Sequence, residues 1–569
     1  MINSKREVAR SLKPLIKMDL ATIEDLLEVP PRPEMGDLAF PCFTLSPTWK
    51  RPPAAIAADL ARRLADKRGD FWERAVAAGP YLNFFLDPQA LGRETLAAIF
   101  KEKGRYGGAT TSNGRRIVID YSSPNIAKPF GIGHLRSTVI GHALSLIYSA
   151  LGYHCIEVNH LGDWGTQFGK IITAFKLWGD EKRLQADPVN YLFHLYVQFH
   201  RQAERDPSLE DEARLWFQQL EQGNPEAEEY WHKFRGLSLE NYQRLYRLLG
   251  IKFDYFHGES HYNRYLEETL ALVKEKGIAV ESEGALLVDL DKHGLPPCLL
   301  QKKDGATLYI TRDIAAAIYR YRRFKFDRAL YVVGAEQKLH FKQLFKIMEL
   351  LGFDWADRLI HIPFGLIRFK GGRMSTRAGK IVLLEEVLEK SIGLARAIIE
   401  EKNPGLAEKD RVAQAIGLGA VRFGDLSNDR IKDIEFDWDQ VMDFAGETAP
   451  YVQYSHARIC SILRKASPPE AEKIGELSGL LQQEEEATLL MLLGLLPERV
   501  VQAAQAYRPS LIARYLLEVA REFNRFYHNC PVLDSEPALR AARLLLIDGT
   551  RQVLANGLGL LGIEAPEEM

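Results

Sequence analysis

The chain has 569 residues and a formal net charge of −2 at pH 7, with 46% hydrophobic and 26% charged residues. This composition is that of a globular protein with roughly three or four domains. It lacks a run of about 18 apolar residues, so we expect no membrane span. Its N-terminus, MINSKREVARSLKPLIKM, lacks the apolar segment of a secretory signal. Because the charge is near zero, a nucleic-acid partner would have to be met by local basic patches.

The five cysteines are scattered and form no C-x-x-C pair. This spacing argues against a disulfide framework and against a structural zinc ribbon, and it fits a reducing cytoplasm. Cys155 lies in YHCIEVNHL, which we interpret as a buried strand, so we expect an inert thiol there rather than a nucleophile.

Residues 1–108 alternate short amphipathic helices with strand-like stretches such as YLNFFLD. They end in GRYGGATTSNGRR, whose glycine, serine and threonine residues are typical of a linker. We therefore predict a separate N-terminal α+β domain.

The region 109–383 begins with the strand-like RIVIDY, a helical pattern that starts near Gly133, and the strand-like HCIEVNHLGDWG. Strand, helix and strand within about 45 residues make a βαβ unit, which predicts a parallel sheet. From about 171 to 250, helical segments with aromatic residues at i, i+3 and i+4 interrupt it, and we interpret them as core seams of a helical insertion. We expect GALLVDL, LYIT, RALYVVGA and IHIPFGLI to be strands of the same resumed sheet.

From Leu384 onward the pattern is almost entirely helical. We predict a helical linker over 384–440 and a separate all-helical domain over 441–569.

Two loops carry groups suited to a nucleotide. In VIDYSSPNIAKPFGIGHLRST, Gly131 and Gly133 follow a strand and open a helix at His134. Close backbone approach and the oriented N–H groups of a helix N-terminus favour a base or a phosphate at the carboxyl end of a parallel sheet. In GGRMSTRAGK, Arg373 and Arg377 are placed to lie across a triphosphate and to stabilise a departing pyrophosphate. Either loop alone is common as an ordinary turn, but the pair in this order indicates a nucleotide site.

Both loops resemble the HIGH and KMSKS signatures of class I aminoacyl-tRNA synthetases, and their surroundings are similar to the arginyl-tRNA synthetase family. The resemblance covers nearly the whole chain. It also rests on NHLGDWGTQFG, TLYITRDIAAA, YVVGAEQKLHFKQLF, YVQYSHARICSI and LANGLGLLGIEAP, and the N-terminal GDLAFP and AGPYLNFFL resemble the family's added tRNA-contacting domain.

The resemblance implies a Rossmann-type parallel sheet with a helical insertion, an N-terminal α+β domain, a stem-contact region over 384–440 and an all-helical anticodon-binding domain. It implies ligation of L-arginine to tRNA(Arg) through an arginyl-adenylate, with activation that requires bound tRNA. ATP would be the nucleotide, with Mg²⁺ carried on its phosphates and no metal site built by the protein. We further expect a monomer in the cytoplasm that has no membrane partner.

Residue by residue, the resemblance implies a catalytic group consisting of Lys128, His134, Arg373 and Arg377. It implies ATP contacts from Gly131, Gly133, His134, Met374 and Ser375. Two positions depart from the family pattern, because Gly131 stands where a first histidine is usual and Arg373 where lysine is frequent. The first change removes one donor near ATP, and the second replaces a point charge by a planar fork.

Recognition of arginine demands carboxylates with planar geometry around a guanidinium. Asp120 ends a buried apolar strand and so needs a partner. Asp313 follows Tyr309 at i+4, although it would serve equally as a helix cap or a first-turn acid. The resemblance implies that the arginine site consists of Asp120, Ser122, Asn125, Tyr309, Asp313 and Gln337.

Three alternatives stay open at this point. The chain fits a class I synthetase for another amino acid, and Gly131 and Arg373 also fit a catalytically weak paralogue that binds tRNA as a regulator or scaffold. The basic stretch YRYRRFKFDR (319–328) fits a solvated helix face as well as a phosphate-contacting patch.

Overall fold

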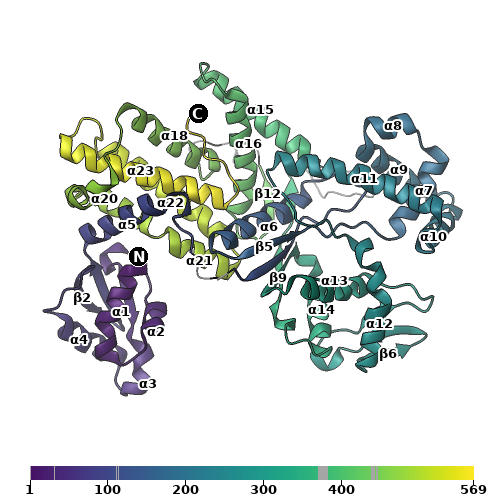
Figure 1. Ribbon diagram of the computed structural model, residues 1–569, viewed down its shortest axis with the longest axis horizontal. Coiled ribbons are helices and arrows are strands. Elements are labelled where there is room, and N and C mark those ends of the chain that lie inside the picture. Colours follow the sequence, from purple (N-terminus) through teal and green to yellow (C-terminus); the bar gives the residue numbers. More distant parts are fainter. Residues whose placement is uncertain are drawn as a thin grey trace.

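A computed structural model describes residues 2–30, 32–109, 112, 114–369, 382–437, 443 and 446–569. A parallel sheet lies near the middle of the molecule (Figure 1). The N-terminal unit and the C-terminal helices lie on one side of this sheet, and the helices inserted within the α/β region extend on the other side.

The N-terminal unit is an α+β domain, as predicted. Its antiparallel sheet has the order β1-β3-β2. The elements are α1 (Ile2–Ile16), α2 (Leu20–Leu26), β1 (Leu38–Pro41), α3 (Ser46–Trp49), α4 (Pro53–Leu64), β2 (Trp72–Ala78), β3 (Tyr81–Leu86) and α5 (Pro88–Glu102). Trp72 is buried and packs edge-on against Phe84 of the neighbouring strand, and its indole N–H donates to the hydroxyl of Ser11 at 3.2 Å, which joins the sheet to α1.

The predicted parallel sheet is confirmed. It has four strands in the order β10-β9-β4-β5, and all three pairings are parallel. The strands are β4 (Arg116–Asp120), β5 (His154–Val158), β9 (Arg328–Gly334) and β10 (Leu359–Phe364). Helix α6 (Gly133–Ala150) connects β4 to β5. Since β4 lies at an inner position, the loop that follows it opens at the centre of the carboxyl edge, where open α/β sheets bind ligands.

The prediction is wrong for two segments, which do not belong to that sheet. GALLVDL forms β7 (Ala285–Val288) of a separate antiparallel sheet with β6 (Ala279–Ser282) and β8 (Cys298–Gln301). LYIT begins helix α13 (Tyr309–Phe324). The four residues LYIT have strand-forming side chains, but the amphipathic pattern that follows them extends the helix back to Tyr309, because a helix gains from burying one continuous apolar face.

The helical insertion is confirmed by five consecutive helices that cover the right-hand end of Figure 1. They are α7 (Thr166–Trp178), α8 (Glu181–Ala186), α9 (Pro188–Ala203), α10 (Ser208–Glu221) and α11 (Pro225–Leu248). Aromatic residues such as Phe175, Tyr230 and Phe234 pack between them, as the core-seam interpretation expects. Helices α12 (Leu266–Glu275) and α14 (Lys338–Leu350) both pack against α13, and the three helices lie below the parallel sheet in the view of Figure 1.

The described residues of the C-terminal third are helical, as predicted, apart from connecting loops and one short strand. Its helices are α15 (Leu384–Lys402), α16 (Lys409–Leu426), α18 (Ala449–Lys465), α19 (Ile474–Leu477), α20 (Glu484–Gly494), α21 (Leu496–Ala506), α22 (Ser510–Asn529) and α23 (Pro537–Leu560). The strand is β12 (Ile434–Phe436), which pairs in parallel with β11 (Ile367–Phe369) and so ties the α15–α16 region to the end of the α/β region.

Among the described residues, no single helix has the length and apolar character needed to cross a membrane. The bent pair α20 and α21 meets that criterion together, by length and composition alone.

Candidate active site

The glycine–histidine turn lies between β4 and α6, at the carboxyl edge of the sheet. His134 is the second residue of α6, and its Nδ1 lies 3.3 Å from the carbonyl oxygen of Gly131. Burial lowers the pKa of the His134 imidazole to about 4, so the ring is neutral at physiological pH. A neutral imidazole carries one proton, and when Nδ1 donates it to Gly131, Nε2 is an acceptor. Donation from Nε2 to a ligand oxygen therefore requires the other tautomer.

The chain returns to this turn after the second signature. Gly131 forms an antiparallel bridge with Leu383, the Ile132 amide donates to the carbonyl of Val382 at 3.0 Å, and the Leu384 amide donates to the carbonyl of Phe130 at 2.9 Å. Val382 is therefore bonded directly to the glycine turn. The expected contributors Arg373, Met374, Ser375 and Arg377 lie outside the described residues, and their roles stay predictions.

Asp120 already has a cationic partner within the chain. Its Oδ2 lies 2.8 Å from Nη1 of Arg320, with side-chain exposures of 7% and 1%, and the Ser123 hydroxyl donates to its Oδ1 at 3.1 Å. The sequence predicted a partner for this acid, and the partner is a guanidinium of α13 rather than solvent. Arg320 belongs to the basic stretch 319–328, so this member of the stretch is a core residue and not a surface contact for phosphate.

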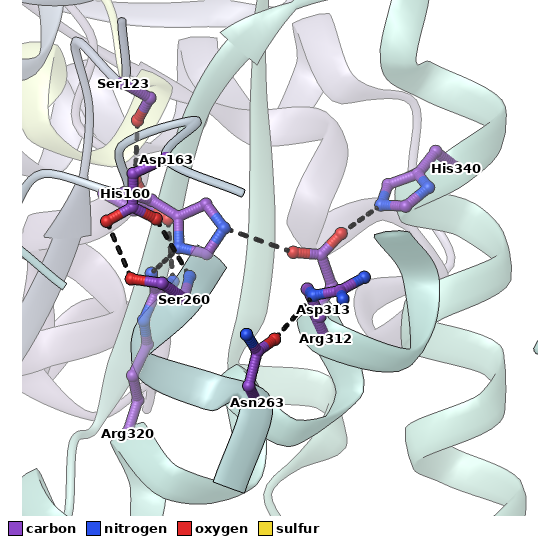
Figure 2. Close-up of polar contacts among 10 residues, drawn as sticks. Ser123, His160, Asp163, Ser260, Asn263, Arg312, Asp313, Arg320 and His340 are labelled. Carbon is purple, nitrogen blue, oxygen red and sulfur yellow. Dashed lines mark hydrogen bonds and ion pairs between the residues drawn. The ribbon is translucent and has the colours of Figure 1, made fainter. Parts of the chain in front are cut away.

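Asp313 lies near the start of α13, and its side chain is 25% exposed. Its Oδ2 accepts a hydrogen bond of 2.7 Å from Nε2 of His340, and its Oδ1 lies 3.7 Å from Nε2 of His160. Burial opposes ionisation, but the bond from His340 and the proximity of His160 hold the pKa of Asp313 below its ordinary value. Figure 2 shows this arrangement, in which His160 lies between Arg320, at 3.4 Å, and Asp313. The carboxylate is therefore ionised and oriented.

A second carboxyl group, Glu259, was not singled out from the sequence. It begins the short 3₁₀ turn Glu259–Tyr265, and its Oε2 is buried without a hydrogen-bond partner among the described residues. Burial, reinforced by the charge of Asp313, raises the pKa of Glu259 to about 8. Burial and the charge of Glu259 also raise the pKa of the Tyr309 phenol. The nearby charge of Arg312 offsets only part of this rise, so the pair of Glu259 and Asp313 gains from a bound cation.

The remaining expected arginine contacts divide into two groups. Tyr309 is 60% exposed and Gln337 is exposed at the end of the short turn after β9, so both are accessible to a ligand. Ser122, in contrast, is buried, and its hydroxyl bonds to those of Thr138 at 2.8 Å and Tyr246 at 2.7 Å. That hydroxyl is therefore already hydrogen-bonded to helices α6 and α11.

Asn125 and Lys128 lie on the loop between β4 and α6. Asn125 forms a parallel bridge with Gly162 in the loop that follows β5. An ideal Cβ on Gly162 would lie 2.1 Å from Oδ1 of Asn125, so glycine is required there for the asparagine to keep its place. The Lys128 ammonium lies 5.2 Å from the ring centroid of Tyr196, which is within cation–π range. The structure thus brings the described candidate residues to one edge of the sheet.

The family model for the catalytic domain of class I (R) tRNA synthetases matches residues 95–438, which is more than half of the chain. The models for the DALR anticodon binding domain and the arginyl-tRNA synthetase N-terminal domain match residues 452–569 and 3–86.

The chain belongs to the arginyl-tRNA synthetase family. It is 47% identical to arginine–tRNA ligase 1 of Bacillus thuringiensis subsp. konkukian, over 99% of this chain and 100% of that one. It is 48% identical to the arginine–tRNA ligase of Enterococcus faecalis over 100% of both chains. The solved structure of the Thermus thermophilus arginyl-tRNA synthetase superposes with a TM-score of 0.84 at 28% identity, covering 99% of each chain.

Family membership confirms the predicted fold class, with its Rossmann-type sheet and helical C-terminal domain. A catalytic domain of this class implies the use of ATP. These matches do not favour the two alternatives, a class I synthetase for another amino acid and a tRNA-binding paralogue that acts as a scaffold. The exact domain boundaries predicted from the sequence stay predictions.

Within this synthetase fold, sequence reasoning missed four residues that build the acidic site: His160, Glu259, Arg320 and His340. His160 and His340 stand in NHLGDWG and QKLHF, stretches already notable for their family resemblance. Glu259 had no comparable signal, because it is a single acid after a glycine in a loop.

Proposed function

We propose that this protein ligates L-arginine to tRNA(Arg) in two steps. The observation that carries the proposal is a pair of carboxyl groups, Asp313 in α13 and Glu259 in the turn before α12, which are close enough for the charge of Asp313 to raise the pKa of Glu259. A guanidinium is the side-chain cation whose planar fork matches two carboxylates best.

In this proposal, Asp313 and Glu259 bind the guanidinium, with Tyr309 and Gln337 at the rim, and Asn125 holds the α-amino and carboxylate groups. Asp120 acts through its ion pair, because it holds Arg320 beside His160 and so orients Asp313. Ser122 likewise acts indirectly, because the hydrogen bonds of its buried hydroxyl help to fix the loop that carries Asn125. Lysine is rejected because its ammonium cannot satisfy acceptors arranged for several N–H donors, and a site with unpaired buried acceptors binds weakly.

The chemistry needs no covalent intermediate on the protein. The arginine carboxylate attacks the α-phosphorus of ATP, pyrophosphate leaves, and the arginyl-adenylate forms. A hydroxyl of the terminal tRNA ribose then attacks the adenylate carbonyl, and AMP leaves. Lys128, Arg373 and Arg377 position the phosphates and stabilise their charge, and His134 donates to a phosphate oxygen from the tautomer that is protonated at Nε2. Gly131, Gly133, Met374 and Ser375 line the ATP-binding surface in this proposal, and the N-terminus of α6 adds its partial positive charge.

Magnesium would enter with ATP. Among the described residues, no cluster of three or more His, Cys, Asp or Glu side chains is placed to hold a metal ion. Mg²⁺ prefers phosphate oxygens and water to an all-protein cage, which supports its binding as part of the Mg·ATP substrate.

The tRNA would contact the protein through its outer domains. We assign anticodon binding to the helical domain and a second contact to the N-terminal domain, with activation dependent on bound tRNA. Unpaired anticodon bases are recognised by stacking and by hydrogen bonds, for which helix α18 offers exposed Tyr454 beside Arg458. We also propose a monomer that acts in the cytoplasm, as translation enzymes do.

The decisive experiment is aminoacylation of total tRNA with each of the twenty amino acids, together with pyrophosphate exchange with and without tRNA. Charging by arginine alone, with exchange only in the presence of tRNA, is the expected result. Charging by another amino acid would overturn the assignment of Asp313 and Glu259, and tight tRNA binding without charging would favour a scaffold.

A further inference from the structure

The loop between β4 and α6 has a strained backbone. Three of its non-glycine residues have left-handed φ values, which are +73° at Ser122, +48° at Ser123 and +58° at Ala127. Non-glycine residues rarely adopt this region, and each such residue persists only where surrounding contacts enforce it. The same loop carries Asn125 and Lys128. The position of these two residues therefore depends on whatever holds the strained loop.

Helix α11 of the insertion supplies a row of hydroxyl groups along this loop. Ser238, Tyr242 and Tyr246 are spaced at i, i+4 and i+8, so they share one face of the helix. All three are buried, with exposures of 0%, 0% and 2%. A row of buried hydroxyls on one helix face is expected to have hydrogen-bond partners across the interface.

The partners of this row lie in the strained loop. The Ala127 amide donates to Oγ of Ser238 at 3.1 Å, and the Tyr246 hydroxyl bonds to Oγ of Ser122 at 2.7 Å. The loop is thus fixed at two of its left-handed residues, Ser122 near its start and Ala127 near its middle.

Tyr242 bonds to the middle of the loop. Its hydroxyl lies 2.6 Å from the carbonyl oxygen of Asn125 and 2.7 Å from that of Lys128. One phenolic proton shared between two carbonyls draws together the backbone of the two residues that are proposed to bind substrate. The ring packs edge-on against Phe130, with 5.7 Å between centroids, so the hydroxyl and the ring act on different parts of the loop.

We infer that Tyr242 is a positioning residue for adenylate formation, and that the helical insertion holds the substrate-binding loop in its strained, active shape through this hydroxyl. Because Tyr242 is fully buried, it acts through Asn125 and Lys128 and not by contact with substrate. The inference rests on the proposed function, since it takes Asn125 and Lys128 as substrate-binding residues.

The test is Tyr242→Phe, which removes the hydroxyl and keeps the ring. Tyr230→Phe is the matched control, because Tyr230 lies on the same helix, about 18 Å along its axis from Tyr242, and packs against Phe175 and Phe234. Two quantities are measured on the full chain. One is arginine-dependent pyrophosphate exchange with tRNA varied up to saturation, and the other is hydrogen–deuterium exchange of the backbone over residues 118–132.

For Tyr242→Phe we expect kcat of pyrophosphate exchange to fall by about tenfold to a hundredfold, since misplacement of reacting groups by about 1 Å has effects of this size. The KM for tRNA stays unchanged, and amides of residues 118–132 exchange faster. Ser238→Ala is expected to accelerate amide exchange in the same segment. Tyr230→Phe matches the wild type in both measurements.

Wild-type amide exchange over residues 118–132 in Tyr242→Phe would overturn the inference, whatever the activity. So would a kcat within threefold of the wild type. If the wild-type protein charged no arginine at all, the proposed function would fail, while the amide-exchange comparison would still decide whether Tyr242 holds the loop.

Discussion

Replacement of Asp313 by asparagine tests the acidic site directly. Asparagine has the size of aspartate and retains an oxygen that can accept the hydrogen bond from His340, so the variant removes the charge with little change of shape. Removing one partner of a hydrogen-bonded charge pair costs about 2–5 kcal/mol when the pair is fully desolvated. The Asp313 side chain is 25% exposed, so we expect the lower part of that range. About 2–3 kcal/mol corresponds to an arginine KM roughly 30-fold to 150-fold higher.

The assay is aminoacylation with tRNA and ATP at saturation and arginine varied over four decades of concentration. The KM values for ATP and tRNA are expected to stay within about twofold of the wild type, because the variant leaves the glycine turn and the outer domains unchanged. Asp291→Asn, at an exposed 3₁₀ turn, is the matched control and is expected to behave as the wild type. An arginine KM raised less than threefold, in a variant that melts at the wild-type temperature, would refute the assignment of Asp313.

Three other predictions concern further residues of the candidate site. Because the pKa of Glu259 is raised to about 8, this acid is protonated in the free protein at pH 7, and it ionises as the pH rises from 7 to 9. The affinity for arginine should therefore increase over this pH range. In calorimetric titrations, Glu259→Gln should bind arginine more weakly than the wild type at pH 9 and should show little change of affinity with pH. Arg320→Met leaves a buried carboxylate without its partner and should lower the free energy of unfolding by about 3–5 kcal/mol in urea melts, whereas replacing its aspartate partner by asparagine as well should restore part of the loss. Gly162→Ala should displace Asn125 and raise the KM for arginine about tenfold. Its control is Gly236→Ala, because the added Cβ meets open space on a helix; this variant should keep the wild-type KM for arginine and melt at a slightly higher temperature.

The main architecture could be predicted from the sequence because its signals are local. The run RIVIDY, the glycine turn and the helix from Gly133 follow one another within a single βαβ unit, and each has its own side-chain pattern. Helix α22 is long and strongly amphipathic, which is the pattern that sequence periodicity reports best.

The short stretches were harder to place. LYIT is strand-like as four residues, yet it is the first turn of a 16-residue helix whose later residues decide its conformation. GALLVDL is a strand, but the sheet to which it belongs depends on hairpin partners that a single sequence does not reveal.

Candidate site residues could be predicted where they belong to a sequence motif. They could not be predicted where their contacts or their shifted pKa values arise only from burial in the folded structure. The sequence pointed to Asp120 and Asp313, but it did not reveal that Arg320, seven residues after Asp313, turns back to pair with Asp120. Glu259 owes its raised pKa to burial beside another carboxylate, which is a property of the packed structure and leaves no mark on the local sequence.

The backbone pairing of the glycine turn with residues 382–384 also bears on how the protein is made. The bridge between Gly131 and Leu383 joins positions roughly 250 residues apart, and the closure of so long a loop is entropically unfavourable until many other contacts have formed. On the ribosome, a nascent chain would carry the signature turn with open N–H and C=O groups until α15 emerged. Amino-terminal fragments that end before residue 382 would therefore contain most of the sheet and still lack a finished catalytic edge.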